Sequence, residues 1–422
     1  MAFHIYTLDP LCIPAMQQVR RMYQSNPAWR KDVTEGKTFG VLVWEGGYLA
    51  AFSGTLGGKT IQPGFVPPIF DNQHPDSRFL QEEAAITSIN QRLASPQVTP
   101  SEICDLRHER KVRSQALQQW LFAQYTFLNI KGRQATLPQL FGTARIPSGA
   151  GDCCAPKLLQ EAFRRHIRPL AIAEWNSCDD RFTPPCTTRC RPILTHMLEG
   201  LDHEPDPRMT QYMATAGNIK TLYQDRHLLI IDKPSGLLSV PGREFYPSVQ
   251  SITSWQPAHR LDQDTSGIML LARDTAILAN LQRQFEHRTI RKQYQAILQH
   301  RMQAGSSGEI TLPLRPDLDD LPHQTVDHIH GRQAQTRYYV QGNTDGHAHV
   351  ILTPHTGRTH QLRVHCAHPE GLDNPILGDR LYGTEGTAHR LMLHASSIEF
   401  THPASGETVK ISSTPEWSDP QD

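Results

Sequence analysis

A carboxylate, a guanidinium and a tight turn stand together in residues 259–267, which read H-R-L-D-Q-D-T-S-G. The Thr-Ser-Gly end of this stretch forms a turn ahead of the apolar residues 268–271, so we expect Asp262 to be held at the entry of a buried strand. An acid fixed beside Arg260 is a carboxylate at neutral pH, suited to act as a nucleophile or an electrostatic stabiliser. Taken alone, such an Asp is more often a surface ion pair or a turn cap.

Two later stretches carry basic and aromatic side chains that suit the same chemistry. Residues 291–294 read R-K-Q-Y, and residues 356–365 read T-G-R-T-H-Q-L-R-V-H. In the second stretch Arg363 and His365 alternate with apolar neighbours, which predicts a strand with both polar side chains on one face. Without further context that face would be solvated, and Tyr294 would be a half-buried packing residue.

The charge of the chain is balanced overall but uneven along its length. Lys and Arg number 42 and Asp and Glu number 42, so the whole molecule does not attract nucleic acid by net charge. Residues 283–301 include Arg288, Arg291 and Lys292 against a single acid, Glu286. A local basic stripe attracts phosphates, and a solvated helix face is the alternative interpretation of the same pattern.

The nine residues 259–267 resemble the signature of the RluA-type pseudouridine synthases, which convert selected uridines of RNA to pseudouridine. Further stretches resemble other parts of that family in the expected order, and they are D-K-P-S-G-L-L at 232–238, R-K-Q-Y-Q-A at 291–296, the T-G-R stretch at 356–365 and P-I-L-G-D-R-L-Y-G at 375–383. The resemblance covers about residues 220 to 412. Several ordered motifs are far more specific than a single match.

The resemblance implies a role for each of three residues. Asp262 is expected to be the catalytic aspartate, Tyr294 to lie against the target base and remove its C5 proton, and Arg363 to pair with Asp262 in the same cleft. The side chain of Arg260 is expected to enter the RNA stack and help expel the target nucleotide. The residues expected to bind RNA are His259, Arg260, Arg291, Lys292, Arg358 and His360.

The implied reaction requires the uridine to leave its stack, which costs a few kcal/mol, roughly. Asp262 then attacks the nucleotide or abstracts a sugar proton, and the uracil turns and rejoins through C5. No cofactor is required, and ribosomal 23S RNA and tRNA are both candidate substrates. The alternative is a non-catalytic RNA-binding protein that assists ribosome assembly, against which the presence of Asp262, Tyr294 and Arg363 argues.

The cysteines suggest a second site. Of the 8 cysteines, five lie in residues 153–190, and in a chain without a recognisable signal sequence a metal or reduced thiols are better expectations than disulfides. A structural zinc would be held by Cys153, Cys154, Cys186 and Cys190, and packed thiols are the alternative. A zinc deaminase would need H-x-E and P-C-x-x-C, but Cys186 and Cys190 are separated by three residues.

Length and composition predict two domains in a protein of 422 residues, with a hydrophobic fraction of 38% and a charged fraction of 20%. We expect an N-terminal mixed α/β domain at 1–205, containing a hairpin at 39–52, helices and the cysteine-rich segment. A linker at 206–217 leads to an α+β catalytic domain at 218–415, built on a central mixed or antiparallel sheet. No secretory signal or long apolar run is evident, so a cytoplasmic, monomeric protein without a membrane partner is expected.

Overall fold

The computed structural model describes residues 2–74, 77–95, 98–179, 181–186, 188–242, 245–384 and 386–417. The chain divides into two compact units, one of residues Met1–Pro207 with Arg243–Phe245 and one of Arg208–Gly242 with Tyr246–Asp422. The segment expected as a linker holds a helix, α8 (Pro207–Ala216). Within the described ranges, no helix combines the length and apolarity that a membrane span requires.

The first unit is a four-stranded sheet with helices on both faces. The strand order is β2-β1-β5-β6, and the predicted hairpin at 39–52 is confirmed as the β1–β2 pair. Residues of α1 pack on one face of the sheet, and residues of α6 and α7 pack on the other. The elements are η1 (Pro10–Cys12), α1 (Ile13–Gln24), η2 (Pro27–Trp29), α2 (Arg30–Thr34), β1 (Thr38–Trp44), β2 (Gly47–Phe52), β3 (Thr126–Leu128), β4 (Gln134–Thr136), α5 (Leu137–Phe141), α6 (Cys154–Arg164), β5 (Ala171–Asn176), β6 (Phe182–Thr183) and α7 (Arg191–Leu198).

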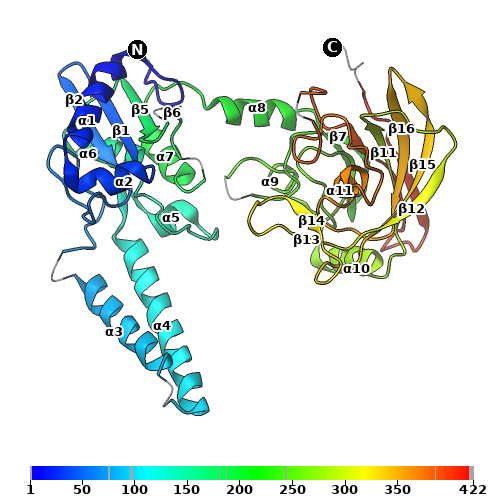
Figure 1. Ribbon diagram of the computed structural model, residues 1–422, viewed down its shortest axis with the longest axis horizontal. Coiled ribbons are helices and arrows are strands. Elements are labelled where there is room, and N and C mark those ends of the chain that lie inside the picture. The colour runs from blue at the N-terminus through cyan, green and yellow to red at the C-terminus, as the bar shows by residue number, and fades with distance from the viewer. Residues whose placement is uncertain are drawn as a thin grey trace. The chain divides into compact units, whose positions relative to one another are not determined.

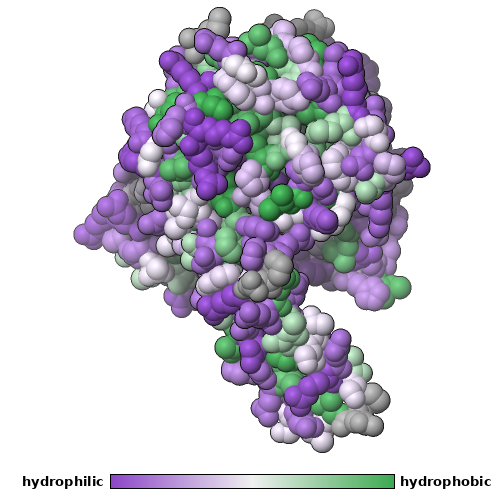
Figure 2. All heavy atoms as spheres, turned by 90° about the vertical axis from the view of Figure 1, so that its left-hand side faces the viewer, coloured by the Kyte–Doolittle hydropathy of each residue, from purple (hydrophilic) through white to green (hydrophobic). Residues whose placement is uncertain are grey.

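A pair of helices, α3 (Arg78–Leu93) and α4 (Pro100–Gln124), extends from this sheet as an arm (Figure 1). Helix α4 starts at a capping box in which Thr99 and Glu102 satisfy each other's backbone N–H groups. The arm's visible surface mixes polar and apolar residues (Figure 2). The buried residues of the two helices are Ile89 of α3 and Leu106 and Leu117 of α4, and Leu121 and Phe122 at the end of α4 pack against the core of the first unit.

The second unit is built on a ten-stranded sheet of order β12-β15-β16-β11-β17-β10-β8-β7, with β18 on β17 and β9 on β10. Nearly all neighbours are antiparallel, but β10 and β17 are parallel, so the predicted α+β architecture with a mixed sheet is confirmed. The elements are β7 (Lys220–Gln224), β8 (Leu228–Lys233), α9 (Val249–Thr253), β9 (Gln256–Pro257), β10 (Ser266–Ala272), α10 (Thr275–Glu286), β11 (Arg291–Leu298), β12 (Ser307–Thr311), β13 (Leu314–Pro316), β14 (Gln324–Val326), β15 (Gln335–Thr344), β16 (His347–Pro354), α11 (Gln361–Ala367), β17 (Leu393–Thr401) and β18 (Thr408–Ser412).

The parallel contact between β10 and β17 is short. It consists of two register pairs, Ser266 with His394 and Gly267 with Ala395. Gly267 has φ +114°, and a Cβ there would lie 2.4 Å from the carbonyl oxygen of Ala395, so only glycine fits. The Ser266 hydroxyl lies 2.8 Å from Nδ1 of His394, which adds a side-chain link at the same place.

Alternate residues of β8 and β10 face two apolar clusters on opposite sides of the sheet. One cluster includes Leu281 of α10, and the other includes residues of α9 and α11. The strand predicted for residues 362–365 is wrong, because these residues belong to helix α11. Residues Gln361 to Cys366 are all buried, so the helix has no solvated face to give its sequence a helical period.

Candidate active site

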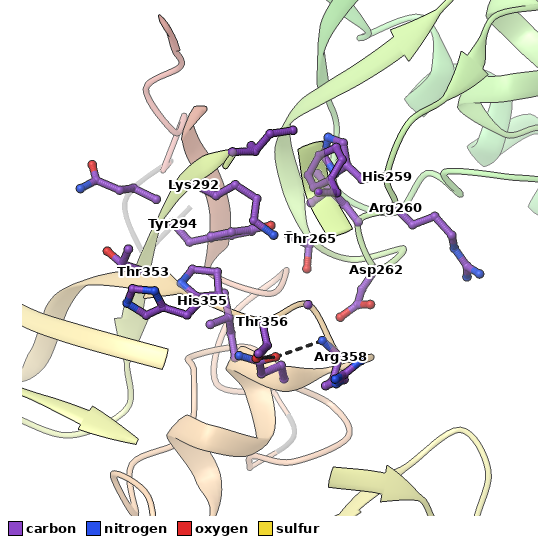
Figure 3. A pocket seen from close by; sticks show the side chains of 18 of the residues that line it. His259, Arg260, Asp262, Thr265, Lys292, Tyr294, Thr353, His355, Thr356 and Arg358 are labelled. Atoms are coloured by element: carbon purple, nitrogen blue, oxygen red, sulfur yellow. Dashed lines mark hydrogen bonds between the residues drawn. The ribbon is translucent and has the colours of Figure 1, made fainter. Parts of the chain in front are cut away.

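One pocket of about 1190 Å³ in the second unit collects every residue that the sequence assigned to catalysis or RNA binding. The residues come from three places: the loop before β10, strand β11, and the segment from the end of β16 into α11. Figure 3 shows Lys292, Tyr294 and His355 on one side and Arg260 and Asp262 on the other. The predicted residues in the lining are His259, Arg260, Asp262, Arg291, Lys292, Tyr294, Arg358, His360 and Arg363.

Asp262 lies in the loop that enters β10. The backbone N–H of Thr265 donates to the Asp262 carbonyl at 3.2 Å, which closes the expected turn. Among the described residues, the Asp262 carboxylate has no hydrogen bond or ion pair, and Figure 3 shows it pointing into the open space beside Arg358. A carboxylate held by its backbone alone is free to react with a ligand.

Lys233, at the end of β8, forms a hydrogen bond to the backbone of this loop. Its fully buried ammonium donates to the carbonyls of Leu237 at 2.7 Å and Gln263 at 2.9 Å. Burial lowers the pKa of Lys233 to about 7, against the opposing effect of the Asp264 and Asp262 charges. The sequence motif contains Lys233, but its role in fixing the backbone beside Asp262 follows only from the structure.

His259 contributes its ring to the wall of the pocket. Its Nε2 accepts a hydrogen bond from the backbone N–H of Leu270 at 3.1 Å, and its ring lies 4.8 Å from that of Phe285. Burial, with a smaller effect from Lys292, lowers the pKa of His259 to about 3. The imidazole is therefore neutral at physiological pH and anchors the loop to strand β10.

Tyr294 is brought to the pocket by β11. It lies opposite Ala395 of β17, at a point where the register shifts between Gln293 and Tyr294. Since Gly267 pairs with the same Ala395, the tyrosine and the start of β10 are one strand apart. Burial, and then the charge of Asp262, raise the pKa of the Tyr294 hydroxyl, which is protonated at neutral pH.

Cations surround the mouth of the pocket. Arg291 is exposed and lies 3.6 Å from Glu399, while the ammonium of Lys292 lies 5.5 Å from the centre of the Phe285 ring. Arg260 is exposed, and its guanidinium makes no hydrogen bond or ion pair to the parts of the chain that the structure describes. The side chain points away from the pocket floor (Figure 3).

The T-G-R stretch forms a turn organised by Gln361. Its Oε1 accepts from the Thr356 hydroxyl at 2.8 Å and from the backbone N–H of Arg358 at 3.0 Å. His360 has φ +52°, and its Nδ1 lies 2.7 Å from the hydroxyl of Tyr382. Burial lowers the pKa of His360. The turn thereby presents Arg358 and His360 to the pocket from a fixed backbone.

The predicted ion pair between Arg363 and Asp262 is wrong. Arg363 instead donates from Nε to Asp379 Oδ2 at 2.8 Å and from Nη2 to Oδ1 at 2.5 Å. Asp379 also accepts from the backbone N–H groups of Leu381 and Tyr382, which fixes its orientation. The segment at 375–383 was recognised in the sequence, but a partner 16 residues from Arg363 follows only from the fold.

The cysteine cluster in the first unit has three members instead of the four predicted. The thiols of Cys153, Cys186 and Cys190 lie within 4.8 Å of one another. Cys154 is turned away, and its Sγ lies 3.5 Å from the carbonyl of Thr38. Cys153 is the extended N-cap residue of α6 and Cys154 its first helical residue, and the two thiols have different neighbours.

The cluster stands where two helices begin. Cys153 is the N-cap of α6 and Cys190 the N-cap of α7. Hydrogen bonds from Cys153 and Cys190, and then from backbone N–H groups, lower the pKa of Cys186. Helix N-termini favour negative charge, so the surroundings support at least one thiolate.

A pocket that joins a fixed carboxylate, a tyrosine and a rim of cations is suited to an anionic substrate such as RNA. The family model for RNA pseudouridylate synthases matches residues 227–368. The dual-specificity RNA pseudouridine synthase RluA of Haemophilus influenzae is 41% identical over 199 residues, which are 44% of this chain and 89% of that protein. The enzyme of the same name from Escherichia coli K12 is 42% identical over 206 residues, with the same two shares, 44% and 89%.

The chain therefore belongs to the RNA pseudouridylate synthase family, and its curated relatives are of the RluA type, as the sequence motifs predicted. Residues Met1–Pro207, the main part of the first unit, lie outside the matched residues, so the chain carries an N-terminal extension. Among solved structures, human RNA pseudouridylate synthase domain containing 1 has a TM-score of 0.39 and 25% identity, covering 50% of this chain and 86% of its own.

Proposed function

We propose that the protein is an RNA pseudouridine synthase that isomerises uridines in 23S ribosomal RNA, tRNA or both. The observation that carries this proposal is the single pocket in which Asp262, Tyr294 and Arg363 meet a rim of cations. Phosphates of an RNA strand would lie against Arg291, Lys292 and other cations of the rim. Family membership supports the same reaction class.

In the proposed reaction, the target uridine leaves its stack and enters the pocket. The guanidinium of Arg260, free of protein partners among the described residues, takes part of the vacated stacking space. Asp262 breaks the bond between N1 and C1′, either by attacking the nucleotide or by removing a sugar proton. The uracil turns, a new bond joins C5 to C1′, the C5 proton leaves, and N1 gains a proton.

Tyr294 and Arg363 complete the proposed machinery. The Tyr294 ring would support the extruded base, and its hydroxyl would take part in removing the C5 proton. Arg363, held by Asp379, would keep positive charge beside Asp262 and the departing uracil. His259, Arg358 and His360 would contact RNA from the walls, and no cofactor takes part in any step.

Pseudouridine mapping tests this function. RNA from a deletion strain complemented with the wild type, with Asp262→Asn or with Asp319→Asn would be treated with a carbodiimide that marks pseudouridine. Asp319 is an exposed acid outside the pocket, which makes it a matched control. We expect the wild type and Asp319→Asn to restore the same marked sites and Asp262→Asn to restore none. Equal marking in all strains would favour a non-catalytic RNA-binding role.

We also propose that Cys153, Cys186 and Cys190 bind one zinc ion. Zinc–sulfur bonds of about 2.3 Å in a tetrahedral site place thiolates roughly 3.8 Å apart. The three thiols lie within 4.8 Å of one another before any ligand is added. Two helix N-termini meet there and favour the charge of the thiolates.

Metal analysis of the purified full-length chain tests the zinc site. We expect about one zinc per chain for the wild type, and far less for Cys186→Ser, because two thiols hold the ion weakly. Cys178→Ser is the control, since Cys178 is exposed and bonds to the Thr34 carbonyl instead. Absence of stoichiometric metal in the wild type would leave the cluster as packed, reduced thiols.

The proposal also includes a division of the chain into domains and an oligomeric state. Residues 218–415 would be the catalytic domain, residues 206–217 its connection and residues 1–205 an additional domain of separate role. The protein would act as a monomer in the cytoplasm. Sedimentation equilibrium of the full chain should give the mass of one chain, 47.6 kDa.

A further inference from the structure

A hydrogen bond joins helix α8 to the loop that carries Asp262. The side-chain Nε2 of Gln263, the residue after Asp262, donates to the hydroxyl of Tyr212 at 2.7 Å. The same Nε2 donates to the carbonyl of Gly236 at 3.2 Å. Tyr212 thus reaches the residue beside the proposed catalytic acid from a helix that precedes the family-matched residues 227–368.

The loop depends on such contacts because the Asp262 carboxylate has no partner among the described residues to orient it. Its direction is set by its backbone. On the inner side, the backbone N–H of Gly236 and the ammonium of Lys233 both donate to the Gln263 carbonyl at 2.9 Å. On the outer side, the hydroxyl of Tyr212 holds the Gln263 side chain.

Tyr212 is itself fixed. Its ring stacks on that of Tyr246, with centroids 4.4 Å apart and planes 6° from parallel. Ala216, one turn later in α8, is buried in the core of the second unit, against which Tyr212 also packs. A phenol held by stacking and core packing is a rigid hydrogen-bond acceptor, so it transmits its position to Gln263.

We propose that Tyr212 is a positioning residue for the catalytic loop, acting on Asp262 through Gln263. This inference rests on the proposed pseudouridine synthase function. It extends the proposed active site beyond the pocket lining, to a helix in the segment that was predicted to be a linker. It also predicts that the hydroxyl matters more than the ring for turnover, because the ring packs on the core and the hydroxyl alone reaches the loop.

The test compares full-length Tyr212→Phe with Tyr223→Phe. The second change also removes a tyrosine hydroxyl from a side-chain hydrogen bond, that of Tyr223 to Asp225 at 3.0 Å, but away from the pocket. We expect Tyr212→Phe to lower kcat about fivefold, the effect of one hydrogen bond. KM and the melting temperature should stay at wild-type values, and Tyr223→Phe should keep wild-type kcat.

Hydrogen exchange supplies a readout that does not depend on activity. The N–H groups of Gly236 and Thr265 bond to the loop carbonyls, so both should exchange faster in Tyr212→Phe and at the wild-type rate in Tyr223→Phe. A double-mutant cycle with Gln263→Ala should show that the two changes are not additive in kcat. Unchanged exchange and kcat in Tyr212→Phe would overturn the inference. A wild type without synthase activity would refute the proposed function, and the exchange rates would still decide whether Tyr212 braces the loop.

Discussion

Arg363 and Asp379 form a buried, bidentate ion pair, with side chains 4% and 0% exposed. The geometry uses Nε and Nη2 of the guanidinium, at 2.8 and 2.5 Å. A paired guanidinium keeps its plane fixed, and the ring of Tyr382 lies 5.2 Å from its central carbon. Asp379 therefore fixes the position from which Arg363 faces the pocket.

Asp379→Asn should destabilise the second unit. The change leaves a buried guanidinium without a counter-charge, which costs about 3 kcal/mol. Thermal unfolding followed by calorimetry should show a lower melting temperature for the transition of this unit, while the transition of the first unit stays in place. The exposed Asp319→Asn serves as the control, and an equal melting temperature for both variants would show that the ion pair contributes little.

Tyr294→Phe should separate binding from chemistry. The ring that would support the base remains, so the Kd for target RNA should stay within about fivefold of the wild type, the effect of losing one neutral hydrogen bond. The hydroxyl that would take part in proton transfer is lost, and the single-turnover rate should fall by at least 100-fold, roughly. Filter binding and rapid-quench assays measure the two quantities. Retention of full turnover would exclude the hydroxyl from the reaction.

Arg260→Ala should lower kcat/KM most for a substrate in which the target uridine is stacked. Removing the inserted side chain leaves the cost of unstacking, a few kcal/mol, without compensation. With a folded stem-loop substrate, kcat/KM should fall about 100-fold, and with an unstructured oligomer of the same sequence the loss should be smaller. Arg291→Ala, at an exposed cation of the same rim, should weaken both substrates similarly. Equal losses for Arg260→Ala on both substrates would argue against the flipping role.

His259 should make the stability of the second unit depend on pH. Its pKa is lowered from 6.5 to about 3 in the folded chain, chiefly by burial. Between these values the unfolded chain binds a proton that the folded chain does not, so stability present above pH 6.5 is lost as the pH falls. One such proton corresponds to a slope of up to about 1.4 kcal/mol per pH unit.

Urea unfolding between about pH 5 and 7, which covers the upper part of that window and the plateau above it, measures the effect. The variant His259→Gln keeps an acceptor for the Leu270 N–H and does not titrate, so its free energy of unfolding should vary less with pH. His365, whose pKa is lowered to about 4 by burial, is unchanged in both proteins and contributes equally. Parallel pH curves for the wild type and His259→Gln would show that His259 is not the source.

The sequence predicted which stretches meet at the pocket better than it predicted the surroundings of the candidate residues. Asp262, Tyr294 and Arg363 lie in separate stretches, and motif order indicated that they meet, which the pocket bears out geometrically. Helix α11 was mistaken for a strand because it is buried on all sides. A helix buried on all sides has no apolar stripe on one face, so the spacing of its apolar residues does not indicate a helix.

Long-range pairings account for the remaining differences. The bonds from Arg363 to Asp379 and from Gln263 to Tyr212 join residues 16 and 51 positions apart, and no local pattern marks either partner. Cys154 was grouped with Cys153 because the two are adjacent, but Cys154 lies near the carbonyl of Thr38 and Cys153 lies near Cys186 and Cys190. Proximity in sequence and proximity in space diverge most at such positions.

Strands β10 and β17 are joined by only two register pairs, and this short contact lies beside the pocket. Asp262 lies in the loop before β10, on one side of this contact. Tyr294 lies on β11, which pairs with β17 on the other side. The two half-sheets are thus joined by very few backbone hydrogen bonds directly beside the pocket. Because Asp262 and Tyr294 stand on opposite sides of this short contact, we expect a bound nucleotide to change their separation more readily than it changes the register within either half-sheet.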